Sequence, residues 1–250
     1  MGGAAFMIHL TNLVVGYKKQ PLMKEMNGCF QSGSLTAVMG LNGTGKSTLL
    51  RTIAQVQKPL EGHIHFPGSK EMTMSWLPQL ADVDRSFPIQ VMDVVSMGCW
   101  PKLSLFRALK ATHCHRVHLA MEQVGILDLA NKTIDQLSGG QFQRMLFARM
   151  LVQNSDVMLM DEPFVGIDTK TRDVLLNLIM ELHQAGKTII AVLHQADIVH
   201  RYFSDLLLLK DGDVLWGKTE KILPHFHDTF QWAEPHLMVN EKIKPSIVEA

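Results

Sequence analysis

A glycine-rich run that ends in a lysine and a hydroxyl side chain is the first feature with clear chemical potential. It reads GLNGTGKS over residues 40–47, and a threonine follows it. Glycines leave room for backbone N–H groups to turn toward an anion, Lys46 adds a mobile positive charge, and the Ser47 hydroxyl suits Mg²⁺. An apolar stretch precedes the run and a helical pattern follows it, as a phosphate-binding loop requires. The residues that we assign to nucleotide binding here are Gly40, Asn42, Gly43, Gly45, Lys46, Ser47 and Thr48.

Two adjacent carboxylates follow a second apolar stretch at residues 157–160. A strand that ends in acid beside a phosphate loop is where such sites hold Mg²⁺, a role that suits Asp161. Glu162 is then placed to orient the attacking water or to take its proton. Alone, the pair reads equally well as a solvated turn before Pro163. With the phosphate loop upstream, the pattern favours hydrolysis of a nucleoside triphosphate.

Short apolar runs without alternation must position these groups. Such runs are typical of strands covered on both faces, as in a parallel sheet. They occupy residues 35–39, 157–160, 188–193 and 205–209. His194 directly follows the third run, where a lone histidine is usually a structural group. Residues 8–15 alternate and predict an exposed or antiparallel strand, and the Asp-Gly pair at 211–212 predicts a hairpin turn.

Helical patterns lie between the strand candidates, which indicates an α/β fold. Two of them, at residues 47–56 and 172–184, repeat an apolar face, and Gly186 is a plausible stop for the second. The two faces consist of Leu49, Ile53 and Val56 and of Leu175, Ile179 and Leu182. Residues 84–136 are mostly helical in pattern, which predicts a small helical lobe inserted into the α/β core. After Lys218 the sequence shows no pattern that we can assign.

The run LSGGQ at residues 137–141, followed by FQR, resembles the signature motif of ABC ATPases. It lies about twenty residues before the acidic pair, as in that family. Glycines and a serine at a helix start offer N–H and hydroxyl donors to phosphate. The resemblance implies that Ser138, Gly139, Gly140 and Gln141 bind nucleotide. In that family the loop at 40–47 is the Walker A motif, and the acidic strand end is the Walker B motif.

The same resemblance implies roles for four further residues. Tyr17 corresponds to the aromatic residue that stacks on adenine, and Gln79 to the Q-loop residue that contacts Mg²⁺ or water and responds to the permease. Asp168 corresponds to the D-loop aspartate and His194 to the switch histidine that senses the γ-phosphate. The implied catalytic residues are Gln79, Asp161, Glu162 and His194, and the implied Mg²⁺ residues are Ser47, Gln79 and Asp161.

The resemblance covers residues 8–220 and implies a P-loop NTPase (RecA-like) core with an antiparallel β subdomain and an inserted α-helical subdomain. We expect an ATPase domain at residues 1–220, with the helical subdomain at 84–140, and a C-terminal tail of unknown role at 221–250. Two departures from the family pattern remove no catalytic group. They are VGID at residues 165–168, where SALD is commoner, and Gln195, where an aspartate often follows the histidine.

One Walker A motif and one signature imply two half-sites, because the family holds each ATP between the Walker A of one subunit and the signature of the other. The resemblance therefore implies an ATP-bound homodimer, although a pair with a similar subunit would also complete the sites. It further implies integral membrane permease subunits, an extracytoplasmic solute-binding protein, and a peripheral place on the cytoplasmic face of the inner membrane.

Two segments resemble the zinc, manganese and iron-chelate importers of the family: residues 84–98 and residues 163–168. A transition metal ion is the cargo that this resemblance implies. Another solute, or export, is compatible with the same motifs. A non-transport ABC ATPase would usually carry a coiled-coil insertion or two cassettes, and neither occurs here. A P-loop kinase would work as a monomer and would leave the signature motif unused.

Composition gives no indication of a nucleic-acid-binding, disulfide-rich or membrane-spanning protein, although a local basic patch is compatible with it. Lys and Arg together number 24, as do Asp and Glu, so no basic field indicates a nucleic-acid partner. The cysteines are Cys29, Cys99 and Cys114, without CxxC spacing, which fits a reducing compartment. Residues 1–6 show no secretory signal, and every apolar run is shorter than the roughly 20 residues that span a bilayer.

A cluster of histidines at residues 113–118 invites a metal-site interpretation, since Cys114 and His118 would share a helix face. His113 and His115 belong to the same cluster. A solvated helix face is the alternative, and we favour it. We likewise expect His225, His227 and His236 to be surface residues.

Overall fold

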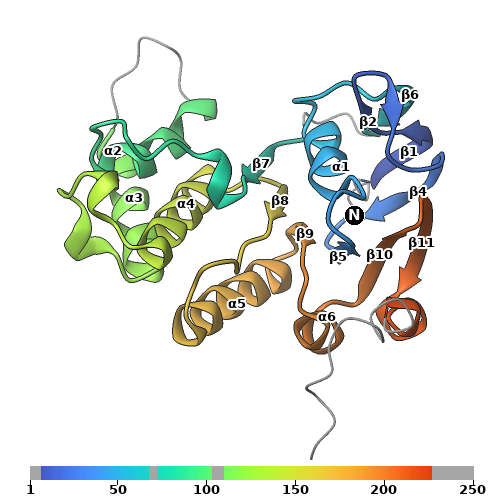
Figure 1. The fold of residues 1–250 in the computed structure, drawn as a ribbon. Coiled ribbons are helices and arrows are strands. Elements are labelled where there is room, and N and C mark those ends of the chain that lie inside the picture. The colour runs from blue at the N-terminus through green and yellow to red at the C-terminus, as the bar shows by residue number, and fades with distance from the viewer. Residues whose placement is uncertain (1–6, 68–71, 103–109, 227–250) are drawn as a thin grey trace, which may run out of the picture.

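A central sheet runs through the computed structural model, which describes residues 7–67, 72–102 and 110–226 (Figure 1). The strands from β10 to β7 are parallel to one another, and β11 is antiparallel to β10. In sheet order they are β11 (Asp213–Lys218), β10 (Asp205–Lys210), β5 (Leu35–Gly40), β9 (Thr188–Val192), β8 (Val157–Asp161) and β7 (Met74–Leu77). The four apolar runs predicted as buried strands are therefore confirmed, and so is the α/β fold class.

An antiparallel sheet covers one face of the central sheet together with α1 (Lys46–Ile53). Its strands, in order, are β4 (Met26–Gln31), β1 (Met7–Val14) and β6 (Glu61–His65). A short ribbon of β2 (Gly16–Tyr17) and β3 (Gln20–Pro21) follows β1. Leu13, Leu49 and Leu207 meet between these layers and are fully buried. The predicted antiparallel strand at residues 8–15 is thus confirmed.

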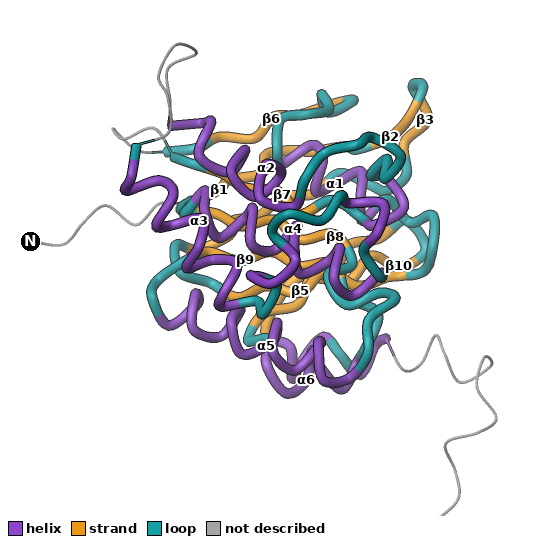
Figure 2. The backbone as a smooth tube through the Cα atoms, turned by 90° about the vertical axis from the view of Figure 1, so that its left-hand side faces the viewer, coloured by secondary structure: helices purple, strands orange, loops and turns teal. Residues whose placement is uncertain are grey.

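Helices cover the opposite face of the central sheet. They are α5 (Thr169–Gln184), α6 (Ala196–Tyr202) and α7 (Thr219–Ile222), together with the lobe formed by α2 (Val91–Ser96), α3 (Ala111–Gln123) and α4 (Gly139–Gln153). Short 3₁₀ turns connect them: η1 (Leu80–Asp82), η2 (Met97–Lys102), η3 (Leu127–Leu129) and η4 (Ile134–Gln136). Figure 2 shows α3 and α4 in front of the strands when the molecule is viewed from the helical side. Coverage of both faces explains why the strand sequences are apolar without alternation.

The helical lobe has its own contacts, in which α2 and α3 pack against α4. Val95, Met121 and Phe147 are fully buried there. Because α4 starts within the predicted subdomain of residues 84–140 and continues to Gln153, packing extends past that boundary. The predicted division into subdomains stays a prediction.

The turn chemistry matches the sequence at two places. Asp211 and Gly212 both have positive φ, at 51° and 81°, as a two-residue hairpin between twisted strands requires. Gly186 has φ 84° just after α5, where a left-handed residue ends a helix. Both predicted signals are therefore confirmed.

The predicted extent of the first helix is wrong at its C-terminal end. Helix α1 stops at Ile53, Gln55 takes φ 60°, and the N–H groups of Val56 and Gln57 both donate to Arg51 O. The prediction that Val56 shares the buried face is also wrong, because Val56 is 70% exposed. A left-handed residue ends the helix here without a glycine, so no sequence signal marked the stop.

Thr219–Ile222, directly after Lys218, form the short helix α7, which the sequence pattern did not indicate. Most of the predicted tail, including His227 and His236, lies outside the described residues, as does the segment 1–6.

Candidate nucleotide-binding site

The phosphate loop joins β5 to α1, and its glycines have the backbone geometry that the sequence predicted. The φ angles are 152° at Gly40, 84° at Gly43 and 96° at Gly45. A Cβ on Gly40 would come within 2.5 Å of Leu209 O, so a side chain there would collide with β10. Gly45 is the N-cap of α1 and has no side-chain cap, and the first turn of α1 carries no acidic residue. This helix start therefore presents N–H donors and a positive dipole end to an anion.

Lys46 is the buried cation of this loop, with only 6% of its surface exposed. Its Nζ donates to Gly40 O at 2.9 Å and to Leu41 O at 2.8 Å. Burial lowers the pKa of Lys46, while the nearby charges of Glu162 and Asp161 raise it. The ammonium is therefore held over the loop by neutral carbonyls, which a phosphate oxygen could replace with a stronger, charge-assisted bond.

Asp161 ends β8 and is fully buried. Its Oδ1 accepts a hydrogen bond from Ser47 Oγ at 3.1 Å. Its Oδ2 is buried and, within the described part of the chain, has no hydrogen-bond partner. Burial, reinforced by the charge of Glu162, raises the pKa of Asp161 although the Ser47 bond lowers it. A buried carboxylate oxygen without a partner, beside a hydroxyl, fits the oxygen ligands that Mg²⁺ takes.

Glu162 follows at once and has φ 51°, a conformation that few residues other than glycine adopt. Its Oε2 accepts a hydrogen bond from Gln79 Nε2 at 2.6 Å, and its Oε1 lies 2.8 Å from His194 Nε2. Gln79 follows β7 and His194 follows β9, so three neighbouring parallel strands converge on one carboxylate. The contacts with Gln79 and His194 help to hold Glu162 in this uncommon backbone conformation.

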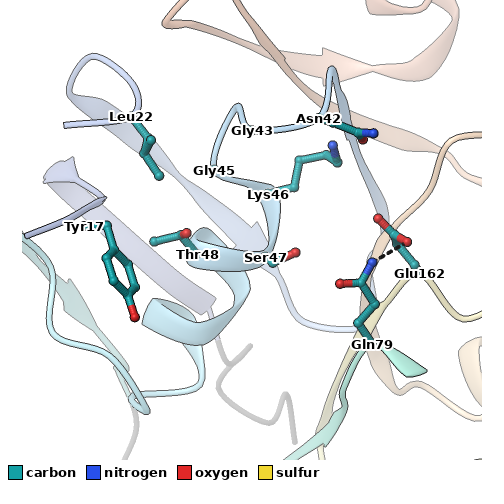
Figure 3. A pocket seen from close by; sticks show the side chains of 10 residues that line it. All are labelled: Tyr17, Leu22, Asn42, Gly43, Gly45, Lys46, Ser47, Thr48, Gln79 and Glu162. Carbon is teal, nitrogen blue, oxygen red and sulfur yellow. Dashed lines mark hydrogen bonds between the residues drawn. The ribbon is translucent and has the colours of Figure 1, made fainter. Parts of the chain in front are cut away.

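Lys46, Gln79 and Glu162 line one pocket of about 460 Å³ (Figure 3). Gly40, Asp161 and His194 are not among its lining residues. The figure shows the Lys46 amine on the side of Asn42, and Tyr17 at the far side of the start of α1. The residues that line the pocket are Tyr17, Leu22, Asn42, Gly43, Gly45, Lys46, Ser47, Thr48, Gln79 and Glu162. All except Leu22 were predicted. Leu22 belongs to no motif, and it reaches the pocket because the turn after β3 places it against Gly45.

The signature residues lie elsewhere. None of Ser138, Gly139, Gly140 and Gln141 lines this pocket. Ser138 is the N-cap of α4: its Oγ accepts from Gln141 N at 3.3 Å, and its own N–H donates to Gln141 Oε1 at 3.0 Å. This reciprocal pair is a capping box, which satisfies two donors of the helix start.

Asp168 lies beside the signature glycines. A Cβ on Gly140 would be 3.7 Å from Asp168 Oδ2, and one on Gly139 would be 3.3 Å from Gly166 O. Asp168 is the N-cap of α5 and accepts from Thr171 N at 2.9 Å and Thr171 Oγ1 at 2.7 Å, which lowers the pKa of this carboxyl. Signature and D-loop thus form one surface that does not reach the pocket of the same chain.

Gln143 is a buried residue that the sequence analysis missed. It is 0% exposed, and its Nε2 donates to Pro163 O at 3.0 Å. The bond ties the first turns of α4 to the loop after Glu162. A glutamine two residues after a signature motif gives no hint of burial, because glutamine is normally exposed.

The histidine cluster predicted at residues 113–118 lies on α3, where His113 Nδ1 accepts from Lys110 N at 3.0 Å. Across residues 7–67, 72–102 and 110–226, no three His, Cys, Asp or Glu side chains are arranged to hold a metal ion. Cys29, Cys99 and Cys114 are all free. No helix among the described segments has the length and apolar character to cross a membrane.

A strand–loop–helix phosphate site with an acidic strand end beside it defines a P-loop nucleoside triphosphatase. Comparisons with known proteins narrow the class. The family model described as "ABC transporter" matches residues 23–165. This chain belongs to the ABC transporter family, and it is an ATPase of that family.

Individual relatives and solved structures agree with this assignment. The manganese transport system ATP-binding protein MntB of Bacillus subtilis is 36% identical over 87% of this chain and 88% of its own length. The zinc transport system ATP-binding protein TroB of Treponema pallidum is 35% identical over 88% of this chain and 86% of its own length. A metal-chelate type ABC transporter in an inward-facing conformation superposes with a TM-score of 0.78 and 28% sequence identity. The match covers 87% of this chain and 85% of that structure's chain.

Proposed function

We propose that this protein is the ATP-hydrolysing subunit of a metal-ion importer, acting as a dimer on the cytoplasmic face of a membrane. The observation that carries the ATP-hydrolysis part of the proposal is the Glu162 carboxylate, which Gln79 and His194 hold at the edge of a pocket lined by the phosphate loop. That arrangement suits attack of water on a bound γ-phosphate.

In the proposed reaction, Tyr17 stacks on adenine while the loop amides and Lys46 bind the β- and γ-phosphates. Glu162 orients the attacking water or takes its proton, and His194 binds the γ-phosphate as its charge grows. Most of the rate enhancement in phosphoryl transfer comes from positioning and charge neutralisation, which these fixed groups provide.

Asp161 and Ser47 are the residues that would hold Mg²⁺, with Gln79 nearby. The buried Oδ2 of Asp161, without a partner among the described residues, supports this assignment. When bound, Mg²⁺ supplies positive charge against the phosphate oxygens.

The place of the signature supports a dimer, and we propose that it is a homodimer. Ser138, Gly139, Gly140 and Gln141 would complete the site of the partner, because they do not line the pocket of their own chain. A dimeric ABC transporter cassette with 25% identity and a TM-score of 0.74 covers 85% of this chain. That likeness supports the arrangement.

The cargo and the remaining partners are inferred from relatives. Proteins named for manganese and zinc transport systems match this chain over more than four fifths of its length. We extend that to uptake of manganese or zinc through separate permease subunits, supplied by an extracytoplasmic solute-binding protein.

Uptake of each metal, measured by elemental analysis, tests the proposal in cells whose own copy carries Glu162→Gln. We expect a selective fall in one metal among zinc, manganese and iron. Glu181→Gln, on the exposed face of α5, is the control and should leave uptake unchanged. If uptake of each of the three metals were the same in the Glu162→Gln strain as in the control strain, the metal assignment would be refuted and the ATPase assignment would stand.

A further inference from the structure

The segment between Gln79 and the helical lobe is shaped by its own side chains. We call residues 79–86 the Q-loop segment; it leaves the end of β7 and passes toward α2 (Figure 1). Asp84 Oδ1 accepts from Ser86 N at 2.8 Å and from Ser86 Oγ at 2.7 Å. This local turn gives the backbone around Arg85 a defined shape.

Arg85 lies over the aromatic ring of Phe142, with its guanidinium carbon 4.2 Å from the ring centroid. Phe142 is fully buried and Arg85 is half-buried, so the contact is partly shielded from water. A cation–π contact of this kind is stronger than one at an exposed site. The aromatic ring thus binds the Q-loop segment to the lobe.

Phe142 belongs to the first turn of the signature helix. Its N–H donates to Ser138 O at 2.9 Å, and it directly follows Gln141. Its neighbour Gln143 is tied to Pro163 O, one residue after Glu162. The start of α4 is therefore held from two sides by loops that follow Gln79 and Glu162, the pair joined by a 2.6 Å hydrogen bond in the pocket.

A second contact fixes the Q-loop segment to the core. Asp82 forms an ion pair with Arg51, in the last turn of the Walker A helix α1. The segment consequently has one anchor on α1, through Asp82, and one on α4, through Arg85. Asp82 and Arg85 are three positions apart in sequence. The segment between them is therefore too short to let α1 and α4, the helices that begin with phosphate-binding loops, move far apart.

We propose that Arg85 is a positioning residue that keeps the signature of one subunit in register with the nucleotide site of that same subunit. The inference rests on the proposed dimer, in which this signature completes the partner's site. A change at Gln79 when ATP binds would then reach the signature through Arg85 and Phe142. Arg85 thereby links the two ATP sites of the dimer without touching nucleotide itself.

The test measures ATP-dependent dimerisation by sedimentation velocity, in a Glu162→Gln background that hydrolyses ATP slowly. Adding Arg85→Gln should raise the ATP concentration that gives half dimer about fivefold, since a partly shielded cation–π contact is lost. Arg85→Lys keeps a cation and should recover part of that loss. Binding of a fluorescent ATP analogue to the monomer should stay unchanged, because Arg85 does not line the pocket.

Matched controls separate positioning from general damage. In the described part of the chain one other arginine lies over an aromatic ring: the guanidinium carbon of Arg201 on α6 is 5.3 Å from the centroid of the Tyr202 ring. Arg201→Gln removes that contact and should not change dimerisation. In a Phe142→Leu background, which keeps an apolar core residue, Arg85→Gln should have no further effect. Additive effects in that double-mutant cycle would refute the Arg85–Phe142 coupling.

The outcomes also separate this inference from the proposed function. If the Glu162→Gln parent dimerises and Arg85→Gln does so at the same ATP concentration, the inference is wrong and the dimer stands. If the parent remains a monomer at saturating ATP, both the dimer and the inference are wrong.

Discussion

Two helices of this molecule begin with glycine-rich loops, but only one of them has its first N–H groups capped by side chains. Helix α1 starts after Gly45, with no side-chain cap and no acid in its first turn. Helix α4 starts after Ser138, which forms a complete capping box with Gln141. The uncapped start leaves its donors for a ligand, whereas the capping box satisfies two donors of the α4 start within the chain.

The difference explains why one start lies in a pocket and the other does not. Loop and helix donors around Lys46 suit an anion, and Lys46 and Asp161 beside them are buried. The α4 start is capped by its own side chains, and in the proposed dimer it meets the nucleotide of the partner. We therefore expect binding by the monomer to depend on α1, and dimerisation to depend on α4.

The largest effect should come from Glu162→Gln. Loss of a general base lowers turnover by about 1,000-fold, while the pocket keeps its shape and its phosphate donors. ATP binding should persist, and a dimer should accumulate in which both helix starts contact the same phosphate. Phosphate release and sedimentation velocity measure the two effects. Normal hydrolysis by this variant would show that Glu162 is not the base.

Lys46→Ala should come next, because it removes the cation from the uncapped helix start. We expect ATP affinity to fall on the order of 100-fold, the value of a lost charge-assisted bond to phosphate. Isothermal titration calorimetry measures it. Lys24→Ala, which removes an exposed lysine paired with Asp213, is the control and should bind normally. If the ATP affinity of Lys46→Ala were unchanged, α1 could not be the main element that binds ATP.

Ser138→Asp separates the capping role of Ser138 from its proposed contact with nucleotide. Aspartate is as good an N-cap as serine, so thermal stability should be retained. Its charge would repel phosphate, and turnover should fall about tenfold. Ser138→Ala should instead cost about 1 kcal/mol of stability through the lost cap. Full turnover in a well-folded Ser138→Asp protein would contradict the dimer proposal.

Asp161→Asn should give the smallest effect, on stability. Since burial raises the pKa of Asp161, the folded state binds its proton more tightly than the unfolded state. The cost of the buried charge is therefore present above the folded-state pKa and disappears below the unfolded-state pKa. At neutral pH and without nucleotide, the variant should melt about 2–4 °C higher. That gain should shrink as pH falls through the folded-state pKa; a gain constant with pH would exclude this cause.

The sequence alone determined which functional side chains follow which strand. The glycines of the phosphate loop, Lys46 and the acidic pair were identifiable because each follows or precedes an apolar run of strand length. Local patterns of this kind involve residues within one turn or one strand, so no tertiary information is needed. The signature run was identifiable in the same way, by its resemblance to a family.

Only the tertiary structure decided which of these groups meet. The order β5-β9-β8-β7 brings Gln79 and His194 to the same carboxylate, although residues 79 and 194 are far apart in sequence. Strand order depends on how helices pack across a sheet, which no single segment encodes. The burial of Gln143 and the contact of Arg85 with Phe142 likewise depend on segments that are distant in sequence. Packing selects one arrangement from several that the local patterns allow, and that choice places the signature outside its own pocket.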